Sequence, residues 1–224
     1  MFYRIVHYIL KVILPIMAKI DSDGVEFLQQ PGSFIVAGNH IGVLEAFLVW
    51  YYINRRDVIL MVAKKYQSRF WARWLGRRLK IVFADQNEPD FTALRTVLSR
   101  LKDGGVFVVT PEGTRSKTGA LIERRTGVGY IAARTKLPIV PAAVTGTQDK
   151  IVKSNLRHLR RVQMTVKVGK PFKLQLIESS NQRSASRDYT DEIMCRIAAL
   201  LPPEYRGIYA DHPRTRQLME GSTL

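Results

Sequence analysis

The sequence is poor in cysteine and in acidic residues. The 224-residue chain contains one cysteine, Cys195, which excludes an intrachain disulfide framework and fits a reducing compartment. Cys195 lies in a segment typical of an amphipathic helix, so a buried, inert thiol is favoured over a nucleophile. Only 19 aspartates and glutamates oppose 35 lysines and arginines, which leaves a net charge of +16. This excess indicates an anionic partner, either nucleic acid, anionic lipid or a phosphorylated substrate.

Metal-binding and nucleotide-binding motifs are also missing. The sequence has no C-x-x-C or H-E-x-x-H motif and no histidine-rich tract, so it predicts no metal site. It has no G-x-G-x-x-G motif or P-loop, so no nucleotide-binding loop is predicted either. Internal repeats are absent. A chain of this length can bury one substantial core, and we expect a single domain.

The most apolar segment, residues 1–20, is interrupted by charge. A membrane-spanning helix needs ~20 apolar residues, and Lys11 stands in the middle of this segment. Lys11 also argues against a signal peptide. We predict that residues 1–20 form a helix lying in a membrane interface. Packing of this helix on the protein's own core is the alternative.

Strands and helices alternate along the next part of the chain. Apolar runs typical of buried strands occupy residues 34–38, 58–62, 106–109 and 138–144, and helical patterns include residues 44–53, 66–79 and 127–134. Beyond these, residues 162–168 fit a half-exposed strand and residues 191–201 fit a helix. The pattern predicts one α/β domain, a mixed β-sheet flanked by helices, over residues 21–210. Residues 211–224 are expected to form a flexible tail.

Polar residues follow two of the predicted strands. His40 and Glu45 come after the first strand, and the block 110–116 follows the strand 106–109. Five residues on a straight helix are ~500° apart, so His40 and Glu45 meet only if His40 precedes the helix and Glu45 begins it. Such a pair can form a base and its orienting carboxylate. Because ligands of open α/β sheets bind at the carboxyl ends of strands, both blocks are expected to share one cleft.

These blocks, in this order, resemble the glycerolipid acyltransferase family, the 1-acyl-glycerol-3-phosphate (lysophosphatidic acid) acyltransferases. The similarity covers residues 34–147. The first family block is seen as Asn39-His40 with Glu45, the third stands complete as Pro-Glu-Gly-Thr-Arg-Ser at residues 111–116, and the fourth is seen at residues 139–142. The first and third blocks in register are a far more specific signal than either block alone.

Two positions depart from the family pattern. Glu45 stands where the family usually has aspartate, and its extra methylene is either absorbed by a rotamer change or weakens the site. Gln86 stands where the second family block usually has an arginine that helps to bind the acceptor's phosphate. A phosphate-bearing acceptor is therefore less firmly implied, although Lys64, Lys65 and Arg115 can supply positive charge.

The resemblance implies a membrane-associated acyltransferase at the cytoplasmic face. It implies transfer of a fatty acyl chain from acyl-CoA or acyl carrier protein to the hydroxyl of a lysophospholipid, chiefly 1-acyl-glycerol-3-phosphate, giving phosphatidic acid. His40 is the expected general base and Glu45 its partner. Acceptor binding is assigned to five residues: Lys64, Glu112, Gly113, Thr114 and Arg115. A thioester donor is already activated, so we expect direct attack without an acyl-enzyme, and no metal or resident cofactor.

Other functions remain open at this point. The chain could acylate a different lipid acceptor, or it could be a non-catalytic lipid-binding relative in which Glu45 marks a degenerate site. The basic and aromatic segment 66–79 suits an anionic membrane, although a helix docked by its aromatic side is the alternative. Nucleic-acid binding would account for the net charge but leaves His40 and the block 111–116 unexplained, so no nucleic-acid partner is expected.

Overall fold

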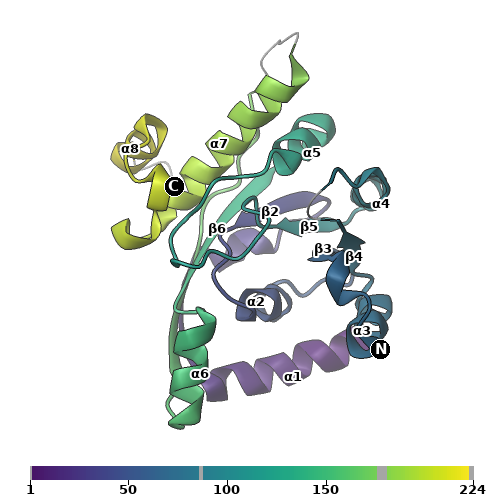
Figure 1. The fold of residues 1–224 in the computed structure, drawn as a ribbon, viewed down its shortest axis with the longest axis vertical. Helices are drawn as coiled ribbons and strands as arrows, with labels where there is room; N and C mark the ends of the chain where they lie inside the picture. The colour runs from purple at the N-terminus through teal and green to yellow at the C-terminus, as the bar shows by residue number, and fades with distance from the viewer. Residues whose placement is uncertain (1, 86–87, 176–180, 222–224) are drawn as a thin grey trace.

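A mixed β-sheet forms the centre of the molecule (Figure 1). The computed structural model describes residues 2–85, 88–175 and 181–221. In the described part of the chain the sheet has seven strands in the order β1-β7-β6-β2-β5-β3-β4. They are β1 Ala18–Asp23, β2 Phe34–Gly38, β3 Val58–Ala63, β4 Val82–Ala84, β5 Val106–Val109, β6 Ile139–Thr145 and β7 Val162–Val168. β7 is antiparallel to β6, and β1 is parallel to β7, so these two run against the other five. The predicted α/β domain with a mixed sheet is confirmed.

Helices cover both faces of this sheet. They are α1 Phe2–Met17, α2 Leu44–Tyr52, α3 Phe70–Leu79, α4 Phe91–Lys102, α5 Gly127–Thr135, α6 Asp149–Arg157, α7 Gln182–Leu200 and α8 Pro213–Glu220. One apolar core lies between the sheet and α4, α5, α7 and α8, and it includes Ile35 and Ala37 of β2. The other lies between the sheet and α1, α2 and α3, and it includes Phe34 and Val36. β2 is therefore apolar at successive positions because neither of its faces meets water.

Helix α1 ends earlier than the sequence predicted. It stops at Met17, and the chain continues directly into β1, so residues 18–20 are strand and not helix. The polar residues Asp21, Ser22 and Asp23 extend this strand beyond the apolar segment. Pairing with β7 decides the outcome: Ala18 lies opposite Val162, 144 positions later in the chain, and both are buried. Local patterns in the sequence do not contain this information.

Helix α1 has two apolar stripes. Leu10 and Leu14 are buried in the core shared with α2. A second stripe at helical spacing stays exposed and consists of Ile5, Tyr8, Ile9, Val12, Ile13 and Ile16. The helix therefore packs on the protein's own core and also presents an apolar surface to the outside. None of the helices among the described residues combines the length and apolarity that crossing a bilayer requires.

The carboxyl-terminal part of the chain is more ordered than predicted. Helix α7 begins at Gln182 and not at Asp191, because α5 and α7 approach closely along it: a Cβ on Gly129 would lie 2.2 Å from the Ser186 carbonyl oxygen. Residues 213–220, expected within a flexible tail, form α8, whose Leu218 is buried against the core that includes α7.

Polar contacts also tie α8 to α7. The Arg214 guanidinium donates to both oxygens of Glu192 on α7. The predicted buried thiol is confirmed: Cys195 is fully buried, with its Sγ 3.2 Å from Nδ1 of His212. Burial raises the pKa of this thiol to about 11, so it stays protonated at neutral pH.

Candidate active site

The site lies where three neighbouring parallel strands end. β6, β2 and β5 are adjacent, and each is followed by residues of the site: Thr147 after β6, His40 after β2 and the block 110–116 after β5. Asn39 fixes the first of these loops. Its side-chain amide donates to the Val144 carbonyl and accepts from the Val144 N–H, both at 2.8 Å, as a backbone group of an added strand residue would. His40 is thereby placed at the edge of the sheet.

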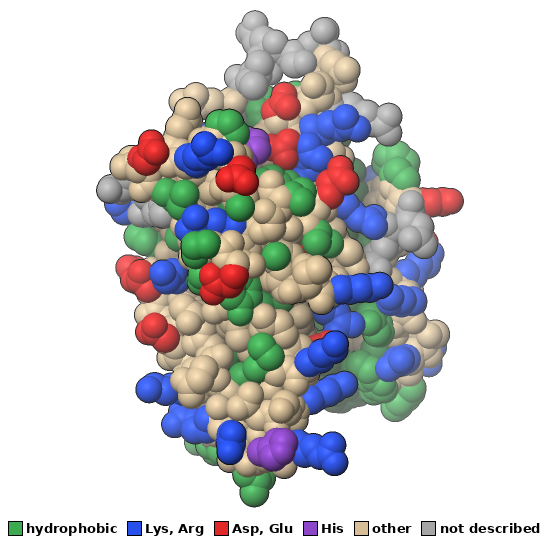
Figure 2. Space-filling view, turned by 60° about the vertical axis from the view of Figure 1, so that its left-hand side comes forward, with side chains coloured by type: hydrophobic (Ala, Val, Ile, Leu, Met, Phe, Trp, Pro, Cys, Tyr) green, Lys and Arg blue, Asp and Glu red, His purple; other side chains and the backbone are tan. Residues whose placement is uncertain are grey.

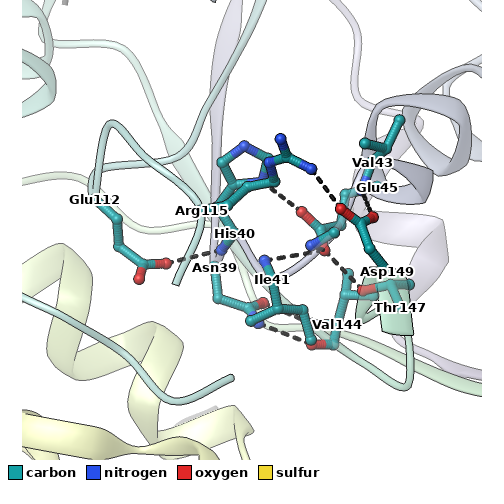
Figure 3. A network of polar contacts seen from close by, with 11 residues as sticks. Asn39, His40, Ile41, Val43, Glu45, Glu112, Arg115, Val144, Thr147 and Asp149 are labelled. Carbon is teal, nitrogen blue, oxygen red and sulfur yellow. Dashed lines mark hydrogen bonds and ion pairs between the residues drawn. The ribbon is translucent and has the colours of Figure 1, made fainter. Parts of the chain in front are cut away.

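His40 and Glu45 meet as the sequence analysis required (Figure 3). His40 lies on the turn before α2, Glu45 lies in the first turn of α2, and His40 Nδ1 is 2.6 Å from Glu45 Oε2. The longer glutamate side chain reaches the imidazole and also folds back over the turn. Its Oε1 accepts hydrogen bonds from the backbone N–H groups of Ile41 and Gly42, at 3.1 and 2.6 Å. The rotamer change therefore absorbs the extra methylene.

The Glu45 carboxylate fixes the state of the imidazole. An ionised carboxylate only accepts hydrogen bonds, so Nδ1 of His40 carries the hydrogen that they share. Nε2 is then unprotonated in the neutral ring and can accept a proton from a substrate hydroxyl. The His40 side chain is 29% exposed while the Glu45 side chain is 10% exposed, so the imidazole is accessible and its carboxylate partner is sheltered.

Thr147 completes the surroundings of Glu45, and the sequence analysis gave it no role. Its hydroxyl donates to Glu45 Oε1 at 2.7 Å, and the residue is fully buried. The backbone of Thr147 also passes very close to the His40 loop. A Cβ at Gly42 would lie 1.8 Å from the Thr147 carbonyl oxygen, so only glycine fits there. The signal available in the sequence was the position of Thr147 just after the predicted strand 138–144.

Glu112 supports the His40 loop from the other side. Its carboxylate accepts from the backbone N–H of His40 at 2.8 Å and from that of Ile122 at 3.2 Å, and the residue is 2% exposed. Burial raises the pKa of Glu112 to about 7, against the opposing effect of these two hydrogen bonds. We expected Glu112 to bind substrate. The structure instead turns it inward, where it positions the backbone of His40.

Arg115 reaches the same loop through an ion pair. Its Nη1 donates to Asp149 Oδ2 at 2.5 Å, and Asp149 Oδ1 accepts from the N–H of Val43 at 3.1 Å. The N–H of Ser116 also donates to the His40 carbonyl at 2.8 Å. The block 111–116 is therefore tied to the His40 loop, as a shared cleft requires. Asp149 had no signal in the sequence beyond its place after β6.

The other predicted acceptor-binding residues lie near this loop or at the same sheet edge. Gly113 has φ +66°, a left-handed conformation that favours glycine in the turn after β5, and Thr114 is exposed beside it. Lys64 is exposed at the end of β3, which β5 separates from β2. Among the described residues, no hydrogen bond or ion pair joins Lys64 to His40. Gln86 lies outside the described residues.

The arrangement provides three chemical functions at one edge of the sheet. The unprotonated Nε2 of His40 can take a proton, and the buried Glu45 can stabilise the resulting imidazolium. The exposed side of the Arg115 guanidinium can receive an anionic group. Within the part of the chain that the structure describes, no three metal-ligating side chains converge.

Known proteins are similar to this chain in sequence. A model of the family described as Acyltransferase matches residues 19–145, more than half of the chain. The chain is 33% identical over 162 residues to the 1-acyl-sn-glycerol-3-phosphate acyltransferase of Cocos nucifera, a match that covers 69% of this chain and 50% of that protein. It is 27% identical over 173 residues to the protein of the same description from Bacillus subtilis, with 76% of this chain and 82% of that protein covered. The chain thus spans about half the length of the coconut relative.

A solved structure has the same fold. The crystal structure of the 1-acyl-sn-glycerophosphate (LPA) acyltransferase from Thermotoga maritima superposes with a TM-score of 0.64. The match covers 87% of this chain and 77% of that chain, at 22% identity, which is a likeness of fold. The resemblance inferred from the two sequence blocks is therefore confirmed at the level of the family.

Proposed function

Because this chain belongs to the acyltransferase family, we propose that it transfers a fatty acyl chain to the hydroxyl of a lysophospholipid, with His40 as the general base. The observation that carries this proposal is the 2.6 Å contact between His40 Nδ1 and the sheltered carboxylate of Glu45. The favoured acceptor is 1-acyl-glycerol-3-phosphate, named in the descriptions of the curated relatives. The product is then phosphatidic acid.

The proposed reaction is a single displacement at the thioester carbonyl of acyl-CoA or acyl carrier protein. The acceptor hydroxyl attacks the carbonyl carbon while Nε2 of His40 takes its proton, and Glu45 stabilises the imidazolium that forms. The carbon–sulfur bond then breaks, and the imidazolium returns the proton to the departing thiolate. An ester and a free thiol are formed, and His40 is again neutral. General-base catalysis of this kind contributes ~10²–10⁴-fold to the rate.

Arg115 is proposed to hold the acceptor's phosphate. One of its nitrogens is bound to Asp149, and the side chain is 38% exposed, so the rest of the guanidinium can turn toward a ligand. Gly113 and Thr114 are proposed to lie against the acceptor in the same turn, which is closed by the hydrogen bond from the Gly113 N–H to the Thr110 carbonyl at 3.0 Å. In this proposal Asp149 orients the Arg115 guanidinium and leaves its other nitrogens available to the phosphate.

Membrane association is proposed from two exposed surfaces that lie at adjoining elements. One is the apolar stripe of α1, and the other is the face of α3 that exposes Phe70, Trp71 and Trp74 among arginines. The edge of the Trp74 ring contacts Phe2 of α1, with the ring centroids 5.3 Å apart. Aromatic and basic side chains together suit the interface of an anionic membrane. A soluble acyl donor favours the cytoplasmic face.

The first test is acyl transfer by the purified protein in detergent micelles. Radiolabelled acyl-CoA and lysophosphatidic acid are incubated with the parent protein, with His40→Ala and with His40→Asn, which preserves the shape of the side chain. Phosphatidic acid formed by the parent and lost in both variants is the expected result. Equal activity in the variants would overturn His40 as the base. No product from the parent with either acyl-CoA or acyl carrier protein would overturn the proposed reaction with this acceptor.

A second candidate function is acylation of a different lipid alcohol. It is favoured by the ion pair between Arg115 and Asp149, which lowers the net positive charge available to a phosphate. A panel of lysophospholipids with other headgroups and of monoacylglycerol separates the two. A higher kcat/KM for an acceptor without a phosphate monoester would replace lysophosphatidic acid as the substrate.

Glu45→Asp tests whether the chain is instead a non-catalytic lipid-binding relative. The structure supports catalysis, since Glu45 already reaches the imidazole. The shorter aspartate cannot keep all four of the contacts that Glu45 makes to His40, Ile41, Gly42 and Thr147. We therefore expect Glu45→Asp to lower kcat. If neither the parent protein nor Glu45→Asp acylated any acceptor of the panel, lipid binding without catalysis would be favoured.

A further inference from the structure

The turn between α6 and β7, residues 158–161, exposes a leucine without a packing role. Leu159 is 96% exposed and has φ +54°, in the left-handed region that strains residues other than glycine, asparagine and aspartate. The turn itself is well formed, because the N–H groups of His158 and Arg160 both donate to the Asn155 carbonyl. An apolar side chain in a strained conformation and in full contact with water stabilises nothing within the monomer.

The surroundings of Leu159 are strongly basic. Arg157, His158, Arg160 and Arg161 adjoin it and are exposed. The sequence has no aspartate or glutamate between residues 150 and 177. Leu159 is thus a single apolar side chain flanked in the sequence by basic ones. This combination matches an apolar layer bordered by anions, as in a membrane surface.

The turn lies at one end of α1. Arg161 Nη2 donates to the Ala18 carbonyl, directly after the last residue of α1, at 2.8 Å. Ile16, in the final turn of α1, is 68% exposed. In Figure 1 the lower end of α6 stands beside one end of α1, and α3 lies at the other end. The exposed stripe of α1 therefore runs between α3 and the α6–β7 turn.

These three elements share one property of sequence. Residues 1–20, 58–84 and 150–177, which contain α1, α3 and the turn, each lack aspartate and glutamate altogether. Figure 2 shows the lower end of the molecule with lysine and arginine side chains and with no acidic side chain in view. Acidic residues are thus absent from the sequence segments that carry the exposed apolar side chains at this end.

We propose that the α6–β7 turn is a further membrane-docking point, at which Leu159 enters the acyl-chain boundary and the adjoining arginines bind anionic headgroups. This inference rests on the membrane association proposed above and adds a contact that α1 and α3 do not supply. The aliphatic Leu159 offers no ring on which a base could stack, whereas aliphatic side chains insert into bilayers. Contacts at both ends of α1 would hold that helix parallel to the membrane plane.

The test is co-sedimentation of the full chain with vesicles of phosphatidylcholine and phosphatidylglycerol. The central variant is Leu159→Asn, because asparagine tolerates the left-handed conformation and Leu159 has no packing to lose. We expect its partition onto vesicles to fall about tenfold, the scale expected for one inserted leucine, with its thermal midpoint unchanged or raised. The matched control is Ile208→Asn at another exposed apolar position, 64% exposed in the turn Gly207–Tyr209 beside α7.

Arg160→Ser separates headgroup binding from insertion. It should lower partition about fivefold on vesicles that contain phosphatidylglycerol, and not on phosphatidylcholine alone. Ile208→Asn should match the parent protein. In detergent micelles, acyl transfer by Leu159→Asn should also equal that of the parent, since the turn takes no part in the chemistry.

The outcomes separate this inference from the membrane association on which it rests. A parent protein that binds no vesicle overturns both. A parent that binds, together with Leu159→Asn that binds equally well, overturns the docking point and leaves the association by α1 and α3 intact. Binding that falls for Arg160→Ser but not for Leu159→Asn also overturns insertion, because it shows a polyanion-binding surface only.

Discussion

The two halves of the candidate site differ in how firmly they are held. Around His40, Glu45 and Glu112 are 8% and 2% exposed, and each carboxylate accepts at least two hydrogen bonds from groups of the fold. Around the proposed headgroup position, the side chains of Arg115 and Asp149 are 38% and 41% exposed and form one exposed ion pair. The proposed base is fixed by buried contacts, while the proposed headgroup position faces water.

This difference has a physical consequence. Electrostatic interactions in a sheltered site are weakly screened by solvent. The contact between Glu45 and His40 can therefore be strong and can fix the orientation of the imidazole. An exposed ion pair contributes little to stability and can exchange partners with a ligand. Four predictions test this contrast.

Glu45→Gln should have the largest effect. An amide nitrogen cannot accept the hydrogen of His40 Nδ1, and one orientation of the amide sets that nitrogen against the N–H of Gly42. We expect kcat to fall about 10³-fold with little change in the acceptor KM. Initial rates with lysophosphatidic acid measure this, with the exposed Glu26→Gln as the matched control. A kcat equal to that of the parent would remove the proposed role of Glu45.

Glu112 should make stability depend on pH. Burial raises its pKa from 4.5 to about 7, so the folded state binds the proton more tightly than the unfolded state. The stabilisation from this group is complete below pH 4.5 and is lost as pH rises through 7, a change of about 3 kcal/mol. Urea unfolding at pH 5 and at pH 8 should show this difference in the parent relative to Glu112→Gln. Identical pH dependence in both would contradict the buried, raised pKa.

Arg115→Gln should separate binding from catalysis. Loss of a charged hydrogen bond to the acceptor should raise KM for lysophosphatidic acid about tenfold, with kcat nearly unchanged. Stability should change by less than about 0.5 kcal/mol, because the side chain is exposed. Monoacylglycerol, which lacks the phosphate, is the control substrate and its KM should not respond. A large loss of kcat for both acceptors would break the contrast between the two halves.

Thr147→Val should lower kcat far less than Glu45→Gln. It removes the hydroxyl that donates to Glu45 Oε1, while the N–H groups of Ile41 and Gly42 still hold that oxygen. We expect kcat to fall about fivefold, less than a full charge-assisted hydrogen bond because two N–H donors remain, and the pH–rate profile to shift. Thr147→Ser keeps the hydroxyl and should restore both. If serine and valine behave alike, Thr147 serves packing and not the orientation of Glu45.

Much of the site could be predicted because its parts are local in the sequence. The placement of His40 before α2 and of Glu45 in its first turn follows from a buried strand, a turn and a helix within 20 residues. The roles of Thr147 and Asp149 could not be predicted, because they depend on β6 lying next to β2. Glu112 was assigned to substrate because sequence shows which residues adjoin in the chain and not which way a side chain turns.

The sequence by itself determined the alternation of strands and helices, the two polar blocks and the net charge, since each follows from residues that are near one another. The tertiary structure decided how far β1 extends, that residues 213–220 fold into α8, and that Thr147 completes the surroundings of Glu45. These depend on pairing between distant segments, such as Ala18 with Val162, and on burial that many elements create together. Hydrophobic periodicity carries no record of which strand will become the neighbour of which.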